Sequence, residues 1–157
     1  MIRVSEAVLP GHPDKLCDFV AESIVQAALA VDGEAYAQIE SALWCDQLWL
    51  SGGYAARGPA LDVERIATEA LDSIALAVNP DARRDPWQVT NAVCRYDVDP
   101  TRWTRHVNDQ AIVIGWAGYD DMVQYLPPEH FLALEFRTAL WEACQGRELS
   151  RCGPDGK

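Results

Sequence analysis

The sequence predicts an α+β fold, a small mixed sheet covered by helices, from three observations. Apolar residues recur at three- and four-residue steps over segments 14–31 and 62–78, the spacing of a helix with one buried face. Short strand-like runs cover 34–40 and 43–51 between these helices, and 87–96 after them. The order helix–strand–strand–helix–strand is typical of helices packed on one face of a small sheet.

Local signals set the ends of these elements. Pro13 suits the start of the first helix, and Asp32-Gly33 stops it. The second strand run ends at Gly52-Gly53. Asp62 is a plausible N-cap for the second helix, and Asn79-Pro80 ends it because proline disfavours helix in the residue before it.

A second, smaller unit follows a polar connector over 97–105. We expect an apolar strand over 111–116, a third helix over 129–145 and a polar tail over 146–157. Since one strand and one helix cannot bury a core alone, this second unit is expected to be incomplete by itself.

Composition excludes several function classes. The 157 residues are 49% hydrophobic and 24% charged, which excludes a disordered or low-complexity chain. The net charge of -11 repels phosphate backbones and anionic lipid, so we expect neither a nucleic-acid nor a membrane partner. Five widely spaced cysteines without a CxxC pair, and an N-terminus without a signal layout, predict reduced thiols in a cytoplasmic protein.

The segment Gly11-His12-Pro13-Asp14-Lys15 is the first candidate site. It places an imidazole, a carboxylate and an ammonium at a helix N-terminus, which favours phosphate, and the carboxylate suits an accompanying Mg²⁺. The alternative is an ordinary charged helix start with a solvated histidine. The chain has two lysines, Lys15 and Lys157, beside eleven arginines, and each lysine closely follows an aspartate. Such rare lysines favour a placed phosphate contact.

Several motifs together resemble the S-adenosylmethionine synthetase (methionine adenosyltransferase) family. Val4-Ser5-Glu6 followed by 11–15 is similar to the family's N-terminal signature. The similarity continues through Ile39-Glu40, Gly52-Gly53, 108–111 and 151–157. The resemblance implies that residues 1–99 form the N-terminal-like domain and that 104–157 begin the family's central domain.

The resemblance also implies a chemistry. In this family the sulfur of methionine attacks C5′ of ATP and displaces tripolyphosphate, with Mg²⁺ and K⁺ as cofactors. The chain's matching positions supply the implied roles. His12 and Lys157 are catalytic; His12, Lys15, Asp109, Asp155, Gly156 and Lys157 bind ATP; Glu6 and Asp14 serve Mg²⁺; and Glu40 serves K⁺.

The sequence departs from the family at the amino-acid subsite. Tyr54 stands where the family has a glutamate, and Tyr96 where it has a methionine-contacting glutamine. Either the amino-acid substrate has changed, or the subsite is inactive or supplied by another chain. The chain is also under half the usual family length, and its connector 97–107 is short where the family carries a gating loop.

Three functions are compatible with these features. The first is a subunit of a split synthetase-like adenosyltransferase, completed by a complementary chain within a homo- or hetero-oligomer, that acts on ATP and an amino acid. The second is a non-catalytic subunit that binds and regulates a full-length synthetase. The third is a simple nucleotide-binding module.

Overall fold

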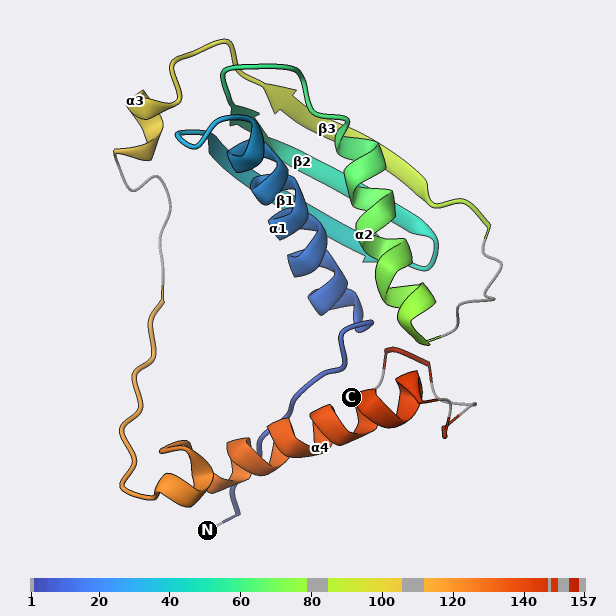
Figure 1. Cartoon of the computed structure of the whole chain (residues 1–157), viewed down its shortest axis with the longest axis vertical. Coiled ribbons are helices and arrows are strands. Elements are labelled where there is room, and N and C mark those ends of the chain that lie inside the picture. Colours follow the sequence, from blue (N-terminus) through green and yellow to red (C-terminus); the bar gives the residue numbers. More distant parts are fainter. Residues whose placement is uncertain (1, 79–84, 106–111, 147, 150–152, 156–157) are drawn as a thin grey trace.

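The computed structural model describes residues 2–78, 85–105, 112–146, 148–149 and 153–155 (Figure 1). The predicted order of helices and strands is confirmed through the first 95 residues. The elements in chain order are α1 (Pro13–Val31), β1 (Tyr36–Trp44), β2 (Gln47–Ala55), α2 (Val63–Val78), β3 (Gln88–Arg95), α3 (Thr101–Thr104), the 3₁₀ turn η1 (Asp121–Val123) and α4 (Pro128–Gln145).

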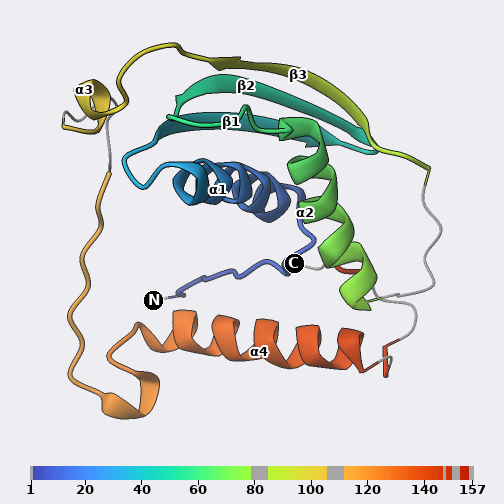
Figure 2. The same cartoon turned by 45° about the horizontal axis from the view of Figure 1, so that its top comes forward.

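The three strands form one mixed sheet in the order β1-β2-β3. β1 and β2 are an antiparallel hairpin that pairs Tyr36 with Ala55 and Trp44 with Gln47. β3 runs parallel to β2, and α2 makes the crossover between them. In the described part of the chain, α1 and α2 lie side by side on one face of the sheet, and the other face is open (Figure 2). The predicted α+β fold is therefore confirmed.

The hydrophobic core lies between the sheet and these two helices. Strand side chains alternate between the faces, so Leu48, Leu50 and Tyr54 of β2 point toward the helices and are buried. Val20 and Ile24 of α1, at helical spacing, meet them from the other side. Together these residues fix which face of the sheet is core and which faces outward.

The position predicted for the hairpin turn is wrong. β1 continues to Trp44 and β2 begins only at Gln47, so the turn is Cys45-Asp46 rather than a gap after residue 40. The reason is backbone chemistry: Cys45 adopts a positive φ of 55°, which tight hairpin turns require but which glycine or asparagine usually supplies.

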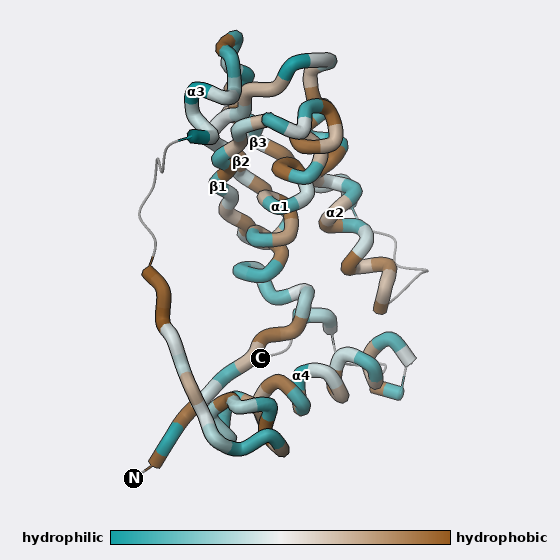
Figure 3. The backbone as a smooth tube through the Cα atoms, turned by 60° about the vertical axis from the view of Figure 1, so that its left-hand side comes forward, coloured by the Kyte–Doolittle hydropathy of each residue, from teal (hydrophilic) through white to brown (hydrophobic). Residues whose placement is uncertain are grey.

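The predicted strand over 111–116 is wrong for the residues described, because 112–116 have no strand partner. Ala111 lies outside the described residues. Ile112, Val113 and Ile114 are each about 90% exposed. Figure 3 shows this hydrophobic stretch standing away from the sheet. An extended segment becomes a strand only when a neighbour takes its backbone hydrogen bonds, and no described segment does so.

The predicted third helix is confirmed as α4, and the N-terminal segment lies along it (Figure 2). The Arg3 guanidinium is 3.6 Å from the Glu129 carboxylate, and Ser5 Oγ is 3.1 Å from His130 Nδ1. In the described ranges, no helix combines the length and the apolar character needed to cross a bilayer.

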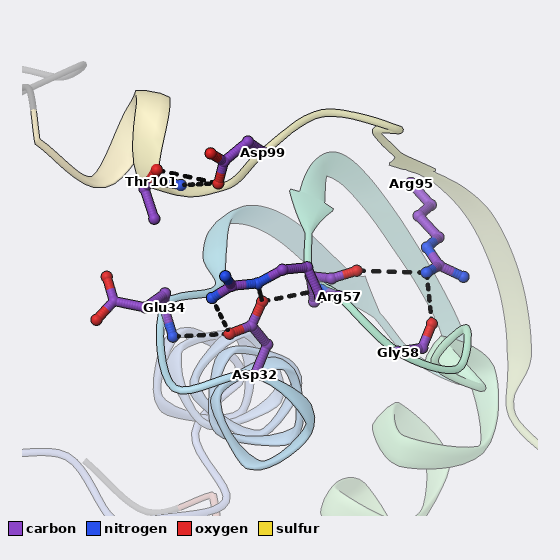
Figure 4. A network of polar contacts seen from close by, with 8 residues as sticks. Asp32, Glu34, Arg57, Gly58, Arg95, Asp99 and Thr101 are labelled. Carbon is purple, nitrogen blue, oxygen red and sulfur yellow. Dashed lines mark hydrogen bonds and ion pairs between the residues drawn. The ribbon is translucent and has the colours of Figure 1, made fainter.

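A polar network ties the end of α1 to the loop after β2 (Figure 4). The Asp32 carboxylate accepts two hydrogen bonds from the Arg57 guanidinium, at 2.7 and 2.8 Å, and one from the Arg57 amide. These bonds hold the pKa of Asp32 well below its ordinary range. Arg95 Nη2 donates to the Gly58 carbonyl oxygen at 2.6 Å, which fastens the same loop to β3.

Candidate functional site

Two motifs that are far apart in the sequence meet in the structure. The Gly11 amide donates a hydrogen bond to the Pro154 carbonyl oxygen at 2.8 Å. Gly11 is buried, and a Cβ at this position would lie only 2.5 Å from Pro154 Cβ. Glycine is therefore required here because the two backbones approach closely. The contact joins the loop that begins α1 to the segment that carries Asp155.

His12 caps the first turn of α1. Its Nδ1 accepts from the Asp14 amide at 3.3 Å, while the Asp14 carboxylate lies 3.8 Å from the same nitrogen, too far for a hydrogen bond. With Nδ1 as the acceptor of this bond, the N–H group that His12 offers to a ligand is the one at Nε2. His12 thus presents one N–H donor beside a helix N-terminus, a combination suited to a phosphate or ribose oxygen.

A cleft of about 380 Å³ lies beside this contact, and we call it the Gly11 cleft. Its walls come from α1, the hairpin turn, α2 and the C-terminal segment. The residues that matter for recognition are Gly11, Trp44, Cys45, Trp87, Pro154 and Asp155. Apolar and aromatic walls with one carboxylate suit a flat, largely apolar group held by a polar contact.

The two other charged residues of the motif point elsewhere. The Lys15 ammonium donates to the Asp18 carboxylate at 3.1 Å, and both residues line a separate cleft of about 460 Å³ with Phe19 and Arg137. Asp14 is exposed to solvent. An exposed pair such as Lys15–Asp18 contributes at most about 1 kcal/mol, so phosphate can replace Asp18 as the partner of Lys15.

A third hollow lies on the open face of the sheet, and we call it the aromatic groove. It has a volume of about 320 Å³ and is lined by Tyr36, Gln38, Glu40, Gly52, Gly53, Tyr96 and Trp103. Trp103, from α3, packs edge-on against Tyr36 and Tyr96, with ring centroids 5.0 Å apart in both pairs. Asp99 steadies the start of α3 by accepting from the Thr101 amide and hydroxyl, and these bonds lower its pKa.

The structure separates the two tyrosines assigned to the amino-acid subsite. Their backbones pair, since the Tyr96 amide donates to the Tyr54 carbonyl oxygen at 2.8 Å. Their side chains lie on opposite faces of the sheet. Tyr54 is 3% exposed in the core, where its hydroxyl accepts from the Leu61 amide, whereas Tyr96 is 40% exposed and lines the aromatic groove.

The two predicted Mg²⁺ ligands and the predicted K⁺ ligand lie on three different parts of the described chain. Glu6 belongs to the N-terminal segment, Asp14 to α1 and Glu40 to the open face of the sheet. Among the described residues, no three histidine, cysteine or acidic side chains gather closely enough to hold a metal ion. These residues therefore do not fit a protein-only metal cage, and each offers one carboxylate.

Three predicted ATP-site residues, Asp109, Gly156 and Lys157, lie outside the described residues. Conversely, Tyr36 and Trp103 line the aromatic groove but are not predicted as site residues from the sequence. Tyr36 shares the two-residue alternation of Gln38 and Glu40, which signals a common face of β1. The place of Trp103 in the groove could not be predicted from periodicity. Trp103 lies in the connector after β3, and tertiary contacts with Tyr36 and Tyr96 place it against the sheet.

Comparisons with known proteins agree with this architecture. A family model described as S-adenosylmethionine synthetase, N-terminal domain, matches residues 1–94. S-adenosylmethionine synthase from Acholeplasma laidlawii is 31% identical over 98% of this chain and 42% of its own length. S-adenosylmethionine synthase 1 from Rhodospirillum rubrum is 29% identical over 98% of this chain and 41% of its own length.

The chain thus spans about two fifths of the length of these curated relatives. A solved structure titled as an unusual S-adenosylmethionine synthetase from Campylobacter jejuni matches 60% of this chain and 27% of its own, with a TM-score of 0.51 and 22% identity. This structural likeness bears on the fold alone. With the family's N-terminal domain matched over residues 1–94, the chain belongs to the S-adenosylmethionine synthetase family.

Proposed function

We propose that this chain is one subunit of a split adenosyltransferase that acts on ATP and an amino acid and is completed by a complementary chain. In the proposed reaction a sulfur lone pair forms a bond to C5′ of ATP. The C5′–O bond breaks, and its electron pair leaves with tripolyphosphate. The protein must align sulfur with carbon and offset the charge that develops on the leaving group.

One observation carries this proposal: the hydrogen bond between the Gly11 amide and the Pro154 carbonyl oxygen. It brings together the two segments that the family resemblance assigns to ATP, although they lie at opposite ends of the chain. In the proposed site His12 Nε2 donates to ATP near the bond that breaks, and Asp155 contacts the nucleotide from the other segment.

The remaining roles follow from the resemblance and the charges. Lys15 and Lys157 would meet phosphate oxygens, with Lys15 exchanging Asp18 for substrate. Asp109 and Gly156 would complete the nucleotide contacts. Tyr96, rather than the buried Tyr54, would face the amino acid.

In this proposal each metal ion is held partly by this chain and partly by ATP, water or the complementary chain. Mg²⁺ is usually held by one or two carboxylates together with substrate phosphates, and it offsets the charge of the leaving polyphosphate. Asp14 and Glu6 would each supply one carboxylate to Mg²⁺, and Glu40 would supply one to K⁺. The other ligands would come from ATP, water or the complementary chain.

A complementary chain also explains the exposed apolar segment Ile112–Trp116. Its first three residues, each about 90% exposed, leave backbone and side chains without a partner in the described structure. The relatives are more than twice as long as the region that this chain matches. A chain that carries the remainder of a synthase would supply the neighbouring strand.

The test is reconstitution with a polypeptide that corresponds to the remainder of a relative, assayed for ATP-dependent release of tripolyphosphate or pyrophosphate. We expect release from the mixture and none from this chain alone. His12→Ala should abolish release from the mixture. Full activity of His12→Ala would contradict its assigned role, and no release from an assembled wild-type pair would contradict the function.

Gly11 provides a sharper variant. Gly11→Ala places a Cβ against Pro154 and should separate the two segments, with loss of turnover. Gly33→Ala is the matched control, because a Cβ at Gly33 meets nothing within 4 Å. Equal activity of the two alanine variants would show that the Gly11–Pro154 contact is not part of the site.

A second candidate function is a non-catalytic subunit that binds and regulates a full-length synthetase. The burial of Tyr54 in the core favours it, because this residue stands where the family resemblance places a glutamate of the amino-acid subsite. This function predicts co-purification with an intact synthetase and no effect of Lys157→Ala. Loss of ATP turnover in Lys157→Ala within an assembled pair would exclude it.

A further inference from the structure

The separate cleft beside Lys15 lies between α1 and α4, and we call it the Arg137 cleft. Its volume of about 460 Å³ falls within the ordinary range of small-molecule sites. Figure 2 shows α4 on the far side of α1 and α2 from the sheet, with the N-terminal segment running along it. The walls of the cleft come from these four parts of the chain, so the fold as a whole holds it open.

Arg137 of α4 is a half-buried cation on this cleft. In the part of the chain that the structure describes, its guanidinium has neither an ion pair nor a hydrogen bond. The other charged side chains of the cleft do have partners. Lys15 Nζ donates to Asp18 Oδ2 at 3.1 Å, and Glu22 Oε1 accepts from Gln26 Nε2 at 2.6 Å. The group that a ligand can still satisfy is therefore the guanidinium.

The guanidinium selects the head group of such a ligand. A half-buried charge has lost part of its hydration, so it gains from a ligand that replaces the missing water. The guanidinium is planar, and its parallel N–H bonds match the two oxygens of a carboxylate. A carboxylate therefore supplies two hydrogen bonds and an opposite charge in one contact. A neutral amide offers one carbonyl oxygen and no charge.

Apolar side chains select the body of the ligand. Phe19 is 40% exposed on the cleft wall, and three half-buried residues line the same cleft: Val8, Pro10 and Ile74. A ligand with an apolar body covers this surface, and removal of apolar surface from water favours binding. Two acidic side chains on the cleft and the chain's net charge of -11 disfavour a multiply charged anion such as phosphate.

We propose that the Arg137 cleft binds a monocarboxylate with an apolar body, whose carboxylate pairs with Arg137 and whose body packs against Phe19 and Ile74. This site goes beyond the proposed function, because Arg137 contacts neither ATP nor the amino acid there. Lys15 keeps the partners already assigned to it. Binding of the monocarboxylate needs neither ATP nor a complementary chain.

The experiment is titration calorimetry of the full chain with 4-methylpentanoate, 4-methylpentanamide, acetate and inorganic phosphate. We expect millimolar or tighter binding of 4-methylpentanoate. The amide lacks the charge, acetate lacks the apolar body and phosphate carries too much charge, so each should bind at least about tenfold more weakly. Equal binding of the amide, of acetate or of phosphate overturns the proposal, and so does no binding of 4-methylpentanoate.

Variants of Arg137 test the anchor. Arg137→Gln removes the charge and should weaken binding of 4-methylpentanoate at least about tenfold, whereas Arg137→Lys keeps the charge without the fork and should give an intermediate loss. Arg102→Gln is the matched control, because Arg102 is an exposed arginine of α3 outside the cleft. It should bind as the parent does. Unchanged binding in folded Arg137→Gln overturns the proposal.

Two further measurements keep the proposal falsifiable if a variant folds poorly. Because Arg137 has no polar partner in the described structure, Arg137→Gln should keep the urea midpoint of the parent, checked by circular dichroism. A lower midpoint would assign Arg137 to the fold and overturn the proposal. Phe19→Ala removes part of the apolar wall and should reduce the preference for 4-methylpentanoate over acetate about threefold or more. An unchanged preference also overturns the proposal.

Discussion

Replacement of Tyr54 by phenylalanine tests whether this residue serves the core or a substrate. The ring is 3% exposed among the core residues of β2, and its hydroxyl accepts a hydrogen bond from the Leu61 amide at 2.9 Å. Phenylalanine keeps the ring and removes the oxygen. The Leu61 amide then loses its acceptor at the end of the loop that leads into α2.

The expected loss of stability follows from that single bond. An ordinary intramolecular hydrogen bond contributes about 0.5–1.5 kcal/mol, and a fully buried orphaned donor costs about 1–3 kcal/mol. Leu61 is only half-buried, so water can reach part of this amide. We therefore expect Tyr54→Phe to lower the free energy of unfolding by about 1 kcal/mol. At a urea slope of about 2 kcal/mol/M, the midpoint falls by about 0.5 M.

The assay is urea unfolding followed by far-ultraviolet circular dichroism, with Tyr96→Phe as the control. Tyr96 is 40% exposed, and removal of its hydroxyl should change stability by less than about 0.5 kcal/mol. An unchanged midpoint in Tyr54→Phe, together with weaker binding of an amino acid, would place Tyr54 in the substrate subsite. That result would refute the assignment of Tyr54 to the core.

Three further predictions follow from burial and charge. Leu50→Ala, at a core position 2% exposed, should cost about 2–5 kcal/mol, whereas Thr90→Ala on the open face should cost less than about 1 kcal/mol in the same urea assay. The pKa of Asp32 lies below its ordinary value of 3.8, so on acidification the unfolded chain takes up this proton first and stability falls below about pH 4. Asp32→Asn should flatten that fall in urea midpoints between pH 7 and pH 3, and a wild-type slope would argue against the Arg57 pair as its cause. Ile114→Lys should leave the free energy of unfolding of this chain unchanged within about 0.5 kcal/mol, because Ile114 is exposed. The same substitution should prevent assembly with a complementary chain, measured by size-exclusion chromatography. Normal assembly would show that 112–116 is not the contact.

The first 95 residues show how far periodicity alone predicts a fold. The helical spacing of Val20 and Ile24 predicts which face of α1 is buried. The alternation of Leu48 and Leu50 does the same for β2, and these two faces pack together in the structure. The turn at Cys45 escaped prediction, because its positive φ is imposed by strand pairing on a residue that does not favour it. Local pattern thus predicted the elements, while pairing between strands set their ends.

The site assignments stay predictions, but the structure shows which of the assigned residues lie on the same part of the molecule. The family resemblance assigns His12 and Asp155 to one nucleotide, and the structure joins the segments that carry them through the hydrogen bond between Gly11 and Pro154. Tyr54 and Tyr96 were assigned to one subsite from their alignment positions. Two residues on neighbouring strands can share a backbone hydrogen bond. Their side chains lie on the same face of the sheet only if the two residues are direct register partners or an even number of residues away from that pairing. Tyr54 pairs with Arg95, not with Tyr96, so the two rings lie on opposite faces.

In the second unit the sequence predicts a strand that the described structure does not contain. Ile112, Val113 and Ile114 have the composition of a buried strand, yet they are exposed in the described structure. A strand signal states only that a segment will pair when hydrogen-bonding and apolar partners are present. The relatives continue well beyond the region matched here, and a neighbouring strand from that remainder would satisfy the signal. The failed strand prediction is therefore itself an argument that this surface is completed by another polypeptide segment, which is what Ile114→Lys tests.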